Sequence, residues 1–305
     1  MKQFTTLTEI QEEAKGHVVV IGNFDGVHKG HQALINKGAN VAKQTGKKLA
    51  ILTFEPHPRV LFRPDEQPSR VTPPDLKAER MQVEGVDYLI SLDFNWDFAS
   101  QSADEFIAGI LKAGLNASHV VIGSDFHFGQ MRSGTPDMIK QAGIDVTVIE
   151  KIKSADSEIY SSSLVRQALR HGDIQRANEM LGWEWEMRGE VVKGDQRGRE
   201  LGYPTANVKL GETVHPAYGV YATWARIEGE EIWRPSATNI GIRPMFEIPT
   251  AQIETFIFDF DREFYGQILH VRPVQRLRSE AKFDSLDELI QQMKKDCEKA
   301  RDILK

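Results

Sequence analysis

The sequence contains one cysteine, Cys297, among its 305 residues. A lone thiol can form neither an intrachain disulfide nor a cysteine-based zinc site, so packing and hydrogen bonds have to hold the fold. Long apolar runs are missing too, and the first residues, Met-Lys-Gln-Phe-Thr-Thr, lack the apolar core of a secretory signal. These absences predict a soluble protein that stays in the reducing cytoplasm and does not engage a membrane.

An excess of positive charge is also missing. The net charge is −6, with 20 basic against 23 acidic residues in 1–183 and 18 against 21 in 184–305. Neither half has the basic surface that neutralises nucleic-acid phosphates, so we expect no DNA or RNA partner. The length is sufficient for two domains, each with a hydrophobic core of its own.

The first motif lies at residues 22–31, Gly-Asn-Phe-Asp-Gly-Val-His-Lys-Gly-His, directly after an apolar run at 17–21. This order predicts a buried strand, a tight turn and the start of a helix. Backbone N–H groups at a helix start carry partial positive charge and favour phosphate. His28 and His31 are expected to share a face of the first turn and to donate to phosphate oxygens. Gly30 between them is expected to leave room for a ligand to approach the backbone.

Strand-like runs alternate with helical patterns through the first half. The runs are residues 18–21, 49–54, 87–91, 119–122 and 146–149. Helix starts are predicted at Thr72 before Pro73 and at Ser102, where Glu105 completes a capping box. Such alternation predicts an open parallel sheet with helices on both faces and a ligand site at the carboxyl ends of the strands.

Three further stretches are expected to converge at that edge. Residues 53–58, Thr-Phe-Glu-Pro-His-Pro, end the second strand with a rigid exit, although a simple strand terminator would look the same. Residues 123–129, Gly-Ser-Asp-Phe-His-Phe-Gly, end the fourth strand with aromatic side chains that can stack on a flat ring. Residues 160–166, Tyr-Ser-Ser-Ser-Leu-Val-Arg, open a helix whose serine and arginine donors suit phosphate, or they form an ordinary serine cap.

The pattern His-x-Gly-His after a strand resembles the signature of the nucleotidylyltransferase superfamily, and residues 22–31 resemble the bacterial bifunctional riboflavin kinase/FMN adenylyltransferase family. A surface turn with two solvated histidines is the alternative. Class I aminoacyl-tRNA synthetases carry a similar motif, but this chain has no Lys-Met-Ser-Lys-Ser element and no basic stripe. The resemblance implies that FMN phosphate attacks the α-phosphorus of ATP in line and that pyrophosphate leaves.

The resemblance assigns roles to residues of the first half. Those expected to stabilise the transferring phosphates are His28, His31 and Arg166. Those expected to bind ATP are Gly22, Asn23, Phe24, Gly30, Ser161, Ser162 and Ser163. Those expected to bind the flavin are Phe54, Pro56, His57, Pro58, Asp125, Phe126 and Phe128. Asp125 departs from the family, which usually has asparagine at this position.

After residue 184 the pattern changes from helices to strands. Strands are predicted at 187–192, 219–227, 231–238, 251–260 and 268–277, and an amphipathic helix at 285–304. Strands at this spacing, with glycine and proline between them, predict a small antiparallel barrel closed by the helix. We place the boundary near Gly182, which gives domains at 1–183 and 184–305, and no internal repeat links them.

Residues 194–207, Gly-Asp-Gln-Arg-Gly-Arg-Glu-Leu-Gly-Tyr-Pro-Thr-Ala-Asn, form the motif of the second half. Its glycines and arginines can wrap phosphates, but the Gly-Lys-Ser/Thr ending of a Walker A loop is absent. Thr205 and Asn207 point to one side of an extended chain, where two neutral oxygens suit Mg²⁺ carried by ATP. The run from Gly202 to Asn207 resembles riboflavin kinase, whose Pro-Thr-Ala-Asn motif holds Mg-ATP. The residues so implied in ATP binding are Gly194, Arg197, Gly198, Gly202, Tyr203 and Pro204.

Glu254 is the candidate base of the second half. Alternation along 251–260 places it on the face that carries the phenylalanines at 256, 258 and 260. A carboxylate there is costly unless it is paired or functional, and desolvation would raise its pKa toward that of a useful base. The resemblance makes Glu254 the base that takes the proton of the riboflavin 5′-hydroxyl. An ion pair with an arginine at the barrel rim is the alternative.

These inferences predict an α/β Rossmann-like nucleotidylyltransferase domain with a parallel sheet, followed by a small antiparallel β-barrel riboflavin kinase domain with a C-terminal helix. Residues 239–244 and 277–283 match the family too, whereas Met245 and Phe256 depart from it. The expected partners are riboflavin, FMN, FAD and ATP with Mg²⁺, and self-association is expected to be weak. A pantetheine-phosphate adenylyltransferase or a glycerol-phosphate cytidylyltransferase would leave residues 204–207 without a role. A non-catalytic flavin-binding protein would need neither His31 nor Glu254.

Overall fold

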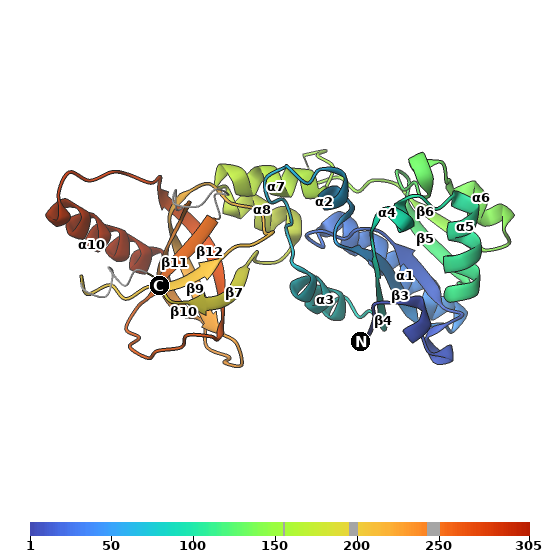
Figure 1. Ribbon diagram of the computed structural model, residues 1–305, viewed down its shortest axis with the longest axis horizontal. Helices are drawn as coiled ribbons and strands as arrows, with labels where there is room; N and C mark the ends of the chain where they lie inside the picture. The colour runs from blue at the N-terminus through green and yellow to red at the C-terminus, as the bar shows by residue number, and fades with distance from the viewer. Residues whose placement is uncertain (155, 195–200, 243–250) are drawn as a thin grey trace. The chain divides into compact units, whose positions relative to one another are not determined.

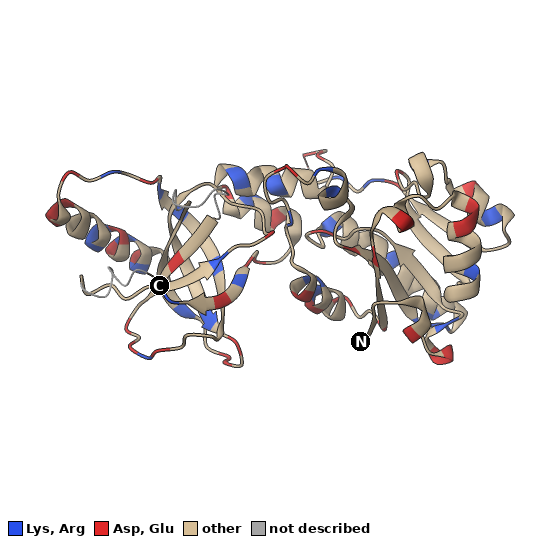
Figure 2. Ribbon diagram, in the orientation of Figure 1, with Lys and Arg blue, Asp and Glu red and all other residues tan. Residues whose placement is uncertain are grey.

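The computed structural model describes residues 1–154, 156–194, 201–242 and 251–305. The chain forms two compact units, of which the first comprises Met1–Glu66 and Thr72–Ser162 and the second Gln67–Val71 and Ser163–Lys305. Figure 1 shows an open sheet in the first unit and a barrel in the second. Figure 2 shows basic and acidic residues interspersed along the helices and strands of each unit, as the balanced charge counts predict.

The first unit is built on a parallel sheet in the order β1-β4-β3-β2-β5-β6. Its strands are β1 (Lys2–Phe4), β2 (Val18–Ile21), β3 (Leu49–Glu55), β4 (Tyr88–Asp93), β5 (His119–Gly123) and β6 (Asp145–Ile149). The predicted parallel sheet is confirmed. The sequence missed β1, because a strand of three residues at a sheet edge is too short to show a period.

Helices cover both faces of this sheet (Figure 1). They are η1 (Leu7–Glu9), η2 (Glu12–Ala14), α1 (Lys29–Thr45), α2 (Pro58–Phe62), α3 (Pro74–Val83), α4 (Trp96–Ala99), α5 (Ala103–Glu105), the π-helix η3 (Phe106–Gly114), η4 (Gln130–Arg132) and α6 (Pro136–Gln141). Alternate residues of β2 face opposite cores: Val18 and Val20 pack with α1 and α3, and Val19 and Ile21 pack with η3 and α6. Burial on both faces explains why β2 is continuously apolar.

Two predicted helix starts have different outcomes. The capping box at Ser102 is confirmed, with reciprocal bonds between Ser102 and Glu105. The start at Thr72 was one residue early, because Pro73 is the N-cap of α3. Thr72 instead accepts a hydrogen bond from Gly26 N–H at 3.0 Å and donates its own N–H to Asp25 Oδ1 at 3.0 Å. Thr72 therefore holds the loop that follows β2.

The second unit is a closed antiparallel barrel in the order β10-β11-β8-β7-β12-β9. Its strands are β7 (Met187–Val192), β8 (Ala206–Lys209), β9 (Gly219–Ile227), β10 (Arg234–Ile242), β11 (Ala251–Ile257) and β12 (Ile268–Arg278). The predicted barrel is confirmed. The sequence missed β8, which begins within the last residues of the motif at 194–207, and β10 runs three to four residues later than predicted. Beyond Ile257 the pleat of β11 stops, and Asp259 has a φ of 55°.

In the described residues of this unit, the helices beside the barrel are α7 (Ser162–His171, whose first residue is counted with the first unit), α8 (Ile174–Leu181) and α10 (Leu286–Ile303). The predicted C-terminal helix is confirmed, and Ser285 caps it by accepting from Glu288 N–H. Ala300 and Leu304 pack on Ala222, Ala237 and Phe258 of the barrel, which fixes α10 against its wall. Over the described parts of the chain, no helix has both the length and the apolar character needed to cross a membrane.

Candidate active sites

Strand order brings the predicted stretches of the first unit together. Strand β2 lies between β3 and β5, and all three run parallel, so the loops after them emerge side by side at one edge. These loops hold residues 22–28, 56–57 and 124–129. From β2 the chain continues to β3 on one side of it, and β5 is later added on the other side. The position between β2 and β5 is therefore the topological switch point, where such sheets bind ligands. Two of the three stretches predicted to converge, residues 53–58 and 123–129, therefore lie at this edge beside the histidine loop.

His28 and His31 lie face to face at the start of α1. His28 is the N-cap, and its Nδ1 accepts a hydrogen bond from His31 N–H at 3.3 Å. The two imidazole centroids are 3.6 Å apart with an interplanar angle of 20°. In a neutral ring whose Nδ1 accepts, the proton is on Nε2, so Nε2–H is the donor that His28 presents. His28 is therefore the N-cap and His31 lies in the first turn of α1, whereas the sequence predicted that both lie in the first turn.

The loop before them is tightly built. Phe24 and Val27 have φ values of 51° and 39°, and Gly26 has 87°. The Phe24 ring is fully buried and lies 5.2 Å from the His31 ring, edge to face, so it supports His31 from the core. A Cβ at Gly22 would meet that ring at 3.2 Å. The contribution of residues 22–24 to a ligand is therefore limited to backbone groups and to the exposed Asn23 side chain.

The structure gives a different reason for glycine at position 30 from the one that the sequence predicted. A Cβ at this position would lie 3.1 Å from the His28 ring and 3.3 Å from the Tyr160 carbonyl oxygen. The space that the sequence analysis reserved for a ligand is therefore occupied by protein. Gly30 is needed because the stacked histidines and the segment before α7 both approach its backbone.

The serine segment meets the histidine loop within the first unit. Ser162 donates its hydroxyl to the Asp25 carbonyl at 2.7 Å, so this hydroxyl is not the open phosphate donor that the sequence predicted. Ser161 belongs to the same unit, whereas Ser163 and Arg166 are counted with the second. There the buried Arg166 donates Nε–H to the Ser69 carbonyl at 2.6 Å.

The expected flavin segment is only partly open. Phe128 is a buried core residue, so its ring is not open to stack on a flavin as predicted, whereas Phe126 is half-buried. Phe54, which the resemblance assigned to the flavin, is buried in the same core. Pro56 is exposed, and Pro58 is the first residue of α2, which His57 caps by accepting from Arg59 N–H. Asp125 is exposed and pairs with Lys151 at 3.0 Å. The sequence missed the ring cluster that continues from Phe54, which consists of Phe62, Phe94, Trp96 and Phe98.

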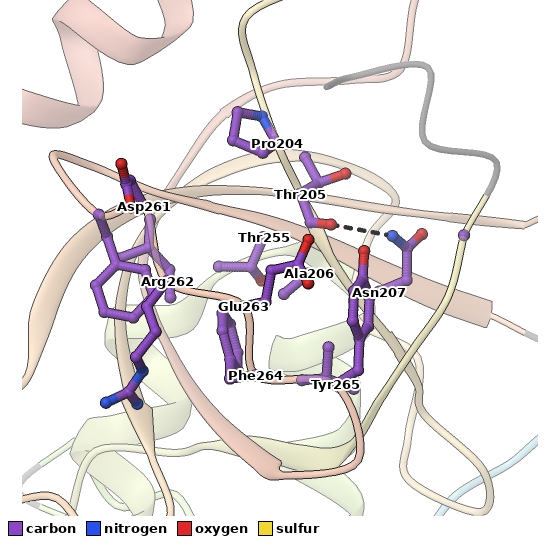
Figure 3. A pocket seen from close by; sticks show the side chains of 14 residues that line it. Pro204, Thr205, Ala206, Asn207, Thr255, Asp261, Arg262, Glu263, Phe264 and Tyr265 are labelled. Atoms are coloured by element: carbon purple, nitrogen blue, oxygen red, sulfur yellow. Dashed lines mark hydrogen bonds between the residues drawn. The ribbon is translucent and has the colours of Figure 1, made fainter. Parts of the chain in front are cut away.

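Two cavities open on the barrel, and they share two residues. The first, of about 240 Å³, is drawn in Figure 3, where Pro204 and Thr205 lie at one end and Phe264 and Tyr265 at the other. The second, of about 440 Å³, is lined by β10, β11 and α10. Thr205 and Asn207 line both cavities. The motif that the sequence selected therefore lies where the two cavities meet.

Asn207 is held in place by its neighbours. Its Nδ2 donates to the Thr205 carbonyl at 3.2 Å, the dashed line of Figure 3, and its Oδ1 accepts from Gln252 Nε2 at 2.9 Å. A Cβ at Gly194 would lie 2.5 Å from the same amide. Gly194 thus allows the chain to pass directly over Asn207. An amide oxygen has two lone pairs, so Oδ1 keeps one acceptor position beside its bond from Gln252.

Glu254 lines the larger cavity between two asparagines. Its cross-strand partners are Asn207 on β8 and Asn239 on β10, and all three line this cavity. Cross-strand neighbours on one face have Cβ atoms about 5 Å apart, so the three polar side chains form one row. Glu254 is half-buried, as the predicted alternation requires. Sequence reasoning noted Asn239 in a family-like stretch but gave it no role.

Other residues shape the larger cavity. Phe256 lines it and packs edge to face on Tyr203 at 5.3 Å. Phe258 packs on Phe256 and under α10, whose residues line the same cavity, so it shares the face of Glu254 as predicted. Phe260 lines the smaller cavity, so the prediction was wrong for that residue. The wall on the α10 side is fixed by Arg278, which binds Asp296 with Nη2–Oδ2 at 2.8 Å. Arg278, which lines this cavity, is thus already in an ion pair with Asp296.

Several predicted residues fall elsewhere. Arg197 and Gly198 of the glycine-rich loop lie outside the described residues, as does Met245. Gly202 has a φ of 82° with open space around it, and Pro204 lines the smaller cavity. Among the residues that the structure describes, no three His, Cys, Asp or Glu side chains are grouped to hold a metal. The oxygen atoms of Thr205 and Asn207 are the hard, neutral donors that suit Mg²⁺ already bound to phosphates.

Comparison with known proteins covers both parts of the chain. The FAD synthetase family model matches residues 10–163, and the riboflavin kinase family model matches residues 181–304. The bifunctional riboflavin kinase/FMN adenylyltransferase of Bacillus subtilis is 40% identical over 95% of this chain and 93% of its own length. The Listeria monocytogenes protein with the same name is 38% identical over 93% of this chain and 91% of its own length.

A solved structure shows the same fold. It is a Streptococcus pneumoniae chain described as a macrolide-efflux protein, and it superposes with a TM-score of 0.86 at 33% identity, over 98% of both chains. The efflux description applies to that protein. The two family models match successive parts of this chain, and the identity to these relatives extends over nearly its whole length. The chain therefore belongs to the family of bifunctional riboflavin kinase/FMN adenylyltransferases.

Proposed function

We propose that the two activities of this family, phosphorylation of riboflavin and adenylylation of FMN, take place at two separate sites of this chain. The kinase site is the barrel, and the adenylyltransferase site is the edge of the parallel sheet at His28 and His31. We assign the first to residues 184–305 and the second to residues 1–183. One observation carries the kinase assignment: Thr205 and Asn207 line both barrel cavities, and Glu254 is the strand partner of Asn207.

In the kinase site, the smaller cavity holds ATP and the larger one holds riboflavin. Gly194 and Pro204, which line the smaller cavity, are proposed to bind ATP. The same role is proposed for Gly202, Tyr203, Arg197 and Gly198. Glu254 takes the proton of the flavin 5′-hydroxyl as that oxygen bonds to the γ-phosphorus, and the bond to the β–γ bridging oxygen breaks. FMN and ADP result. The position of Glu254 at the junction side of the larger cavity supports this role.

Thr205 and Asn207 are proposed to hold Mg²⁺ that arrives with ATP. Their oxygens are neutral, so most of the charge balance has to come from the phosphates, as is usual for this ion. When bound, Mg²⁺ neutralises charge on the β- and γ-phosphate oxygens. Gln252 and the close passage of Gly194 keep the Asn207 amide in one orientation, which is the contribution of the protein.

In the adenylyltransferase site, a phosphate oxygen of FMN bonds to the α-phosphorus of ATP, and pyrophosphate leaves. No proton has to be removed from this nucleophile, so the histidines serve as donors to the phosphate oxygens. Stacking on His28 and packing on Phe24 hold the His31 ring before ATP binds, which lowers the cost of reorganisation during the reaction. Ser161, Ser163 and Arg166 are proposed to add donors. The residues proposed to contact the flavin are Pro56, His57, Pro58, Asp125 and Phe126.

We place the protein in the cytoplasm because its substrates include ATP and because its lone cysteine requires no oxidising compartment. Weak self-association and the absence of a nucleic-acid partner stay predictions. Purified protein incubated with riboflavin and Mg-ATP, followed by chromatography of flavins, tests the assignment. We expect FMN and then FAD from the native chain, FAD from supplied FMN with Glu254→Gln, and FMN alone with His31→Ala. Equal loss of both activities in either variant would contradict separate sites.

A further inference from the structure

A buried lysine lies beneath the loop that precedes the histidines. Lys77 is on α3, and its side chain is 4% exposed. Its ammonium forms an ion pair with Glu55, the last residue of β3. It also donates to the Asn23 carbonyl oxygen at 3.3 Å and lies 3.4 Å from Thr53 Oγ1. A charged group at this depth is costly and persists only where several partners offset its desolvation.

The Asn23 carbonyl oxygen accepts a second hydrogen bond, from Thr53. Thr53, which is fully buried, donates its hydroxyl to this oxygen at 3.2 Å. In a trans peptide the carbonyl and the following N–H point in opposite directions. Because the Asn23 carbonyl points toward Thr53 and Lys77, the N–H of Phe24 points away from them. Within the described ranges, no residue accepts a hydrogen bond from that N–H.

Lys77 also connects two parts of the edge. One partner, Asn23, belongs to the segment assigned to ATP. Another, Glu55, directly precedes Pro56 and His57 of the segment assigned to the flavin. Strands β2 and β3 are neighbours, so a single ammonium between their carboxyl ends sets the spacing of the two loops.

We propose that Lys77 is a positioning residue for adenylyl transfer. With Thr53, it holds the peptide between Asn23 and Phe24 so that the Phe24 N–H donates to the phosphates of ATP or pyrophosphate. This inference rests on the proposed assignment of residues 22–24 to ATP. Lys77 does not touch the substrate. It acts through one backbone amide, and amides fixed in this way are the usual donors of a phosphate-binding loop.

The test uses the reverse reaction, in which FAD and pyrophosphate give FMN and ATP. The kinase site does not use pyrophosphate, so the KM for pyrophosphate reports the sheet-edge site alone. We expect Lys77→Met and Thr53→Val each to raise this KM at least about tenfold, the loss expected for a charge-assisted or buried hydrogen bond. The KM for FAD is expected to change less than about twofold. Thr53→Ser keeps the hydroxyl and is expected to restore the native KM.

Controls separate a positioning role from a structural one. Riboflavin phosphorylation by the same variants reports on the barrel and is expected to stay native. Lys112→Met removes an exposed lysine of the same unit and is expected to leave both KM values unchanged. The double variant Lys77→Met/Glu55→Gln tests whether Lys77 acts only by neutralising Glu55. Recovery of the native KM in the double variant would overturn the proposal, and persistence of the defect supports it.

The proposal and the site assignment fail in different ways. If Lys77→Met and Thr53→Val keep a native KM for pyrophosphate while His31→Ala is inactive, the site stands and Lys77 has no positioning role. If His31→Ala forms FAD normally, the assignment of residues 22–31 itself fails. If Lys77→Met does not fold, the pair Thr53→Val and Thr53→Ser decides, because valine matches threonine in shape. Equal KM values for those two variants would count against the inference.

Discussion

Glu254 of β11 is the direct cross-strand partner of Asn207 of β8. The two side chains therefore lie on one face of the barrel wall, and both line the larger cavity. Asn207 also lines the smaller cavity, so the pair spans the junction between the proposed flavin and nucleotide sites. A base and a ligand of the phosphate-bound metal have to be neighbours in a kinase, and adjacent strands provide that spacing.

Replacement of Glu254 by glutamine is expected to lower the rate of riboflavin phosphorylation by about 10²- to 10⁴-fold, the usual contribution of a general base. The amide keeps the shape of the side chain but cannot take the hydroxyl proton. FAD formation from supplied FMN is expected to stay native and serves as the control. Steady-state rates with each flavin check this, and a native phosphorylation rate would remove Glu254 from the reaction.

Gly194→Ala is expected to impair the kinase without unfolding the chain. The new methyl group would lie 2.5 Å from the Asn207 amide, so this side chain has to move. Displacement of a positioning group by about 1 Å can cost a hundredfold in rate. We expect the phosphorylation rate to fall by at least about tenfold.

Gly109→Ala is the matched control for this glycine. A methyl group there meets nothing within 4 Å, and alanine is favourable in a helix. Both activities of this variant are expected to equal those of the native chain. A Gly194→Ala enzyme with a native phosphorylation rate would show that the position of Asn207 does not limit the kinase.

His31→Ala is expected to lower FAD formation by about a hundredfold or more, comparable with removal of one preorganised donor to a reacting oxyanion. FMN affinity is expected to change much less, since the proposed role of His31 is to donate to the phosphates of ATP. Riboflavin phosphorylation is expected to be unaffected. Rates at saturating FMN, together with FMN binding by fluorescence, distinguish a rate effect from a binding effect. A loss confined to FMN affinity would contradict the assignment.

Glu186 is expected to stabilise the barrel unit at neutral pH. Burial acts to raise the pKa of this carboxyl, but the hydrogen bond with His270 and the charge of Arg188 outweigh it and lower the pKa from 4.5 to about 2. A lowered pKa contributes stability above the unfolded value, and this stability is lost as the pH falls toward 2. The shift corresponds to about 3 kcal/mol.

Urea unfolding followed by tryptophan fluorescence tests this contribution. Glu186→Gln is expected to be less stable than the native chain by a constant amount between pH 5 and pH 8. The difference is expected to shrink below about pH 4.5, where the unfolded carboxyl takes up a proton. A difference that stays the same at pH 3.5 would show that the carboxylate charge is not its source.

Cys297 is expected to react slowly and to report flavin binding. Burial raises the pKa of this thiol to about 11, and Asp296 beside it acts in the same direction. Only the thiolate reacts, so the alkylation rate is expected to rise about tenfold for each pH unit between 7.5 and 9.5. Because Cys297 lines the larger cavity, riboflavin is expected to protect it. Mass spectrometry after iodoacetamide treatment measures both effects, and reaction unaffected by riboflavin would place the flavin elsewhere.

Local patterns predicted much of the fold. The β-branched run at 18–21, the capping box at Ser102 and the helix start at Ser285 depend on neighbours within a few residues, and the structure contains all three. The sequence missed β1 and β8, because strands of three and four residues are held by pairing with distant strands. The predicted alternation of side chains does not extend to Phe260 for a related reason. β11 ends at Ile257, and side chains alternate between faces only while the strand is paired.

The sequence pointed to candidate residues but not to the contacts that they make. Glu254 and Asn207 were identified by motif resemblance, but their pairing depends on strand register, which no local pattern encodes. Ser162 and Gly30 were also candidates, but both make contacts within the protein. These contacts arise because residues 160–162 lie against the histidine loop. Lys77 carries no motif and resembles any solvated helix lysine until the fold buries it.

The sequence by itself determined two domain types, their order, the chemistry of their motifs and the family to which the chain belongs. These properties are carried by residue identity and short-range spacing, which the linear chain retains. The tertiary structure alone decided which side chains meet: His28 with His31 in a stack, Glu254 beside Asn207, and Lys77 beneath Asn23. Such contacts arise from strand order, register and burial, because packing brings together residues that are far apart along the chain.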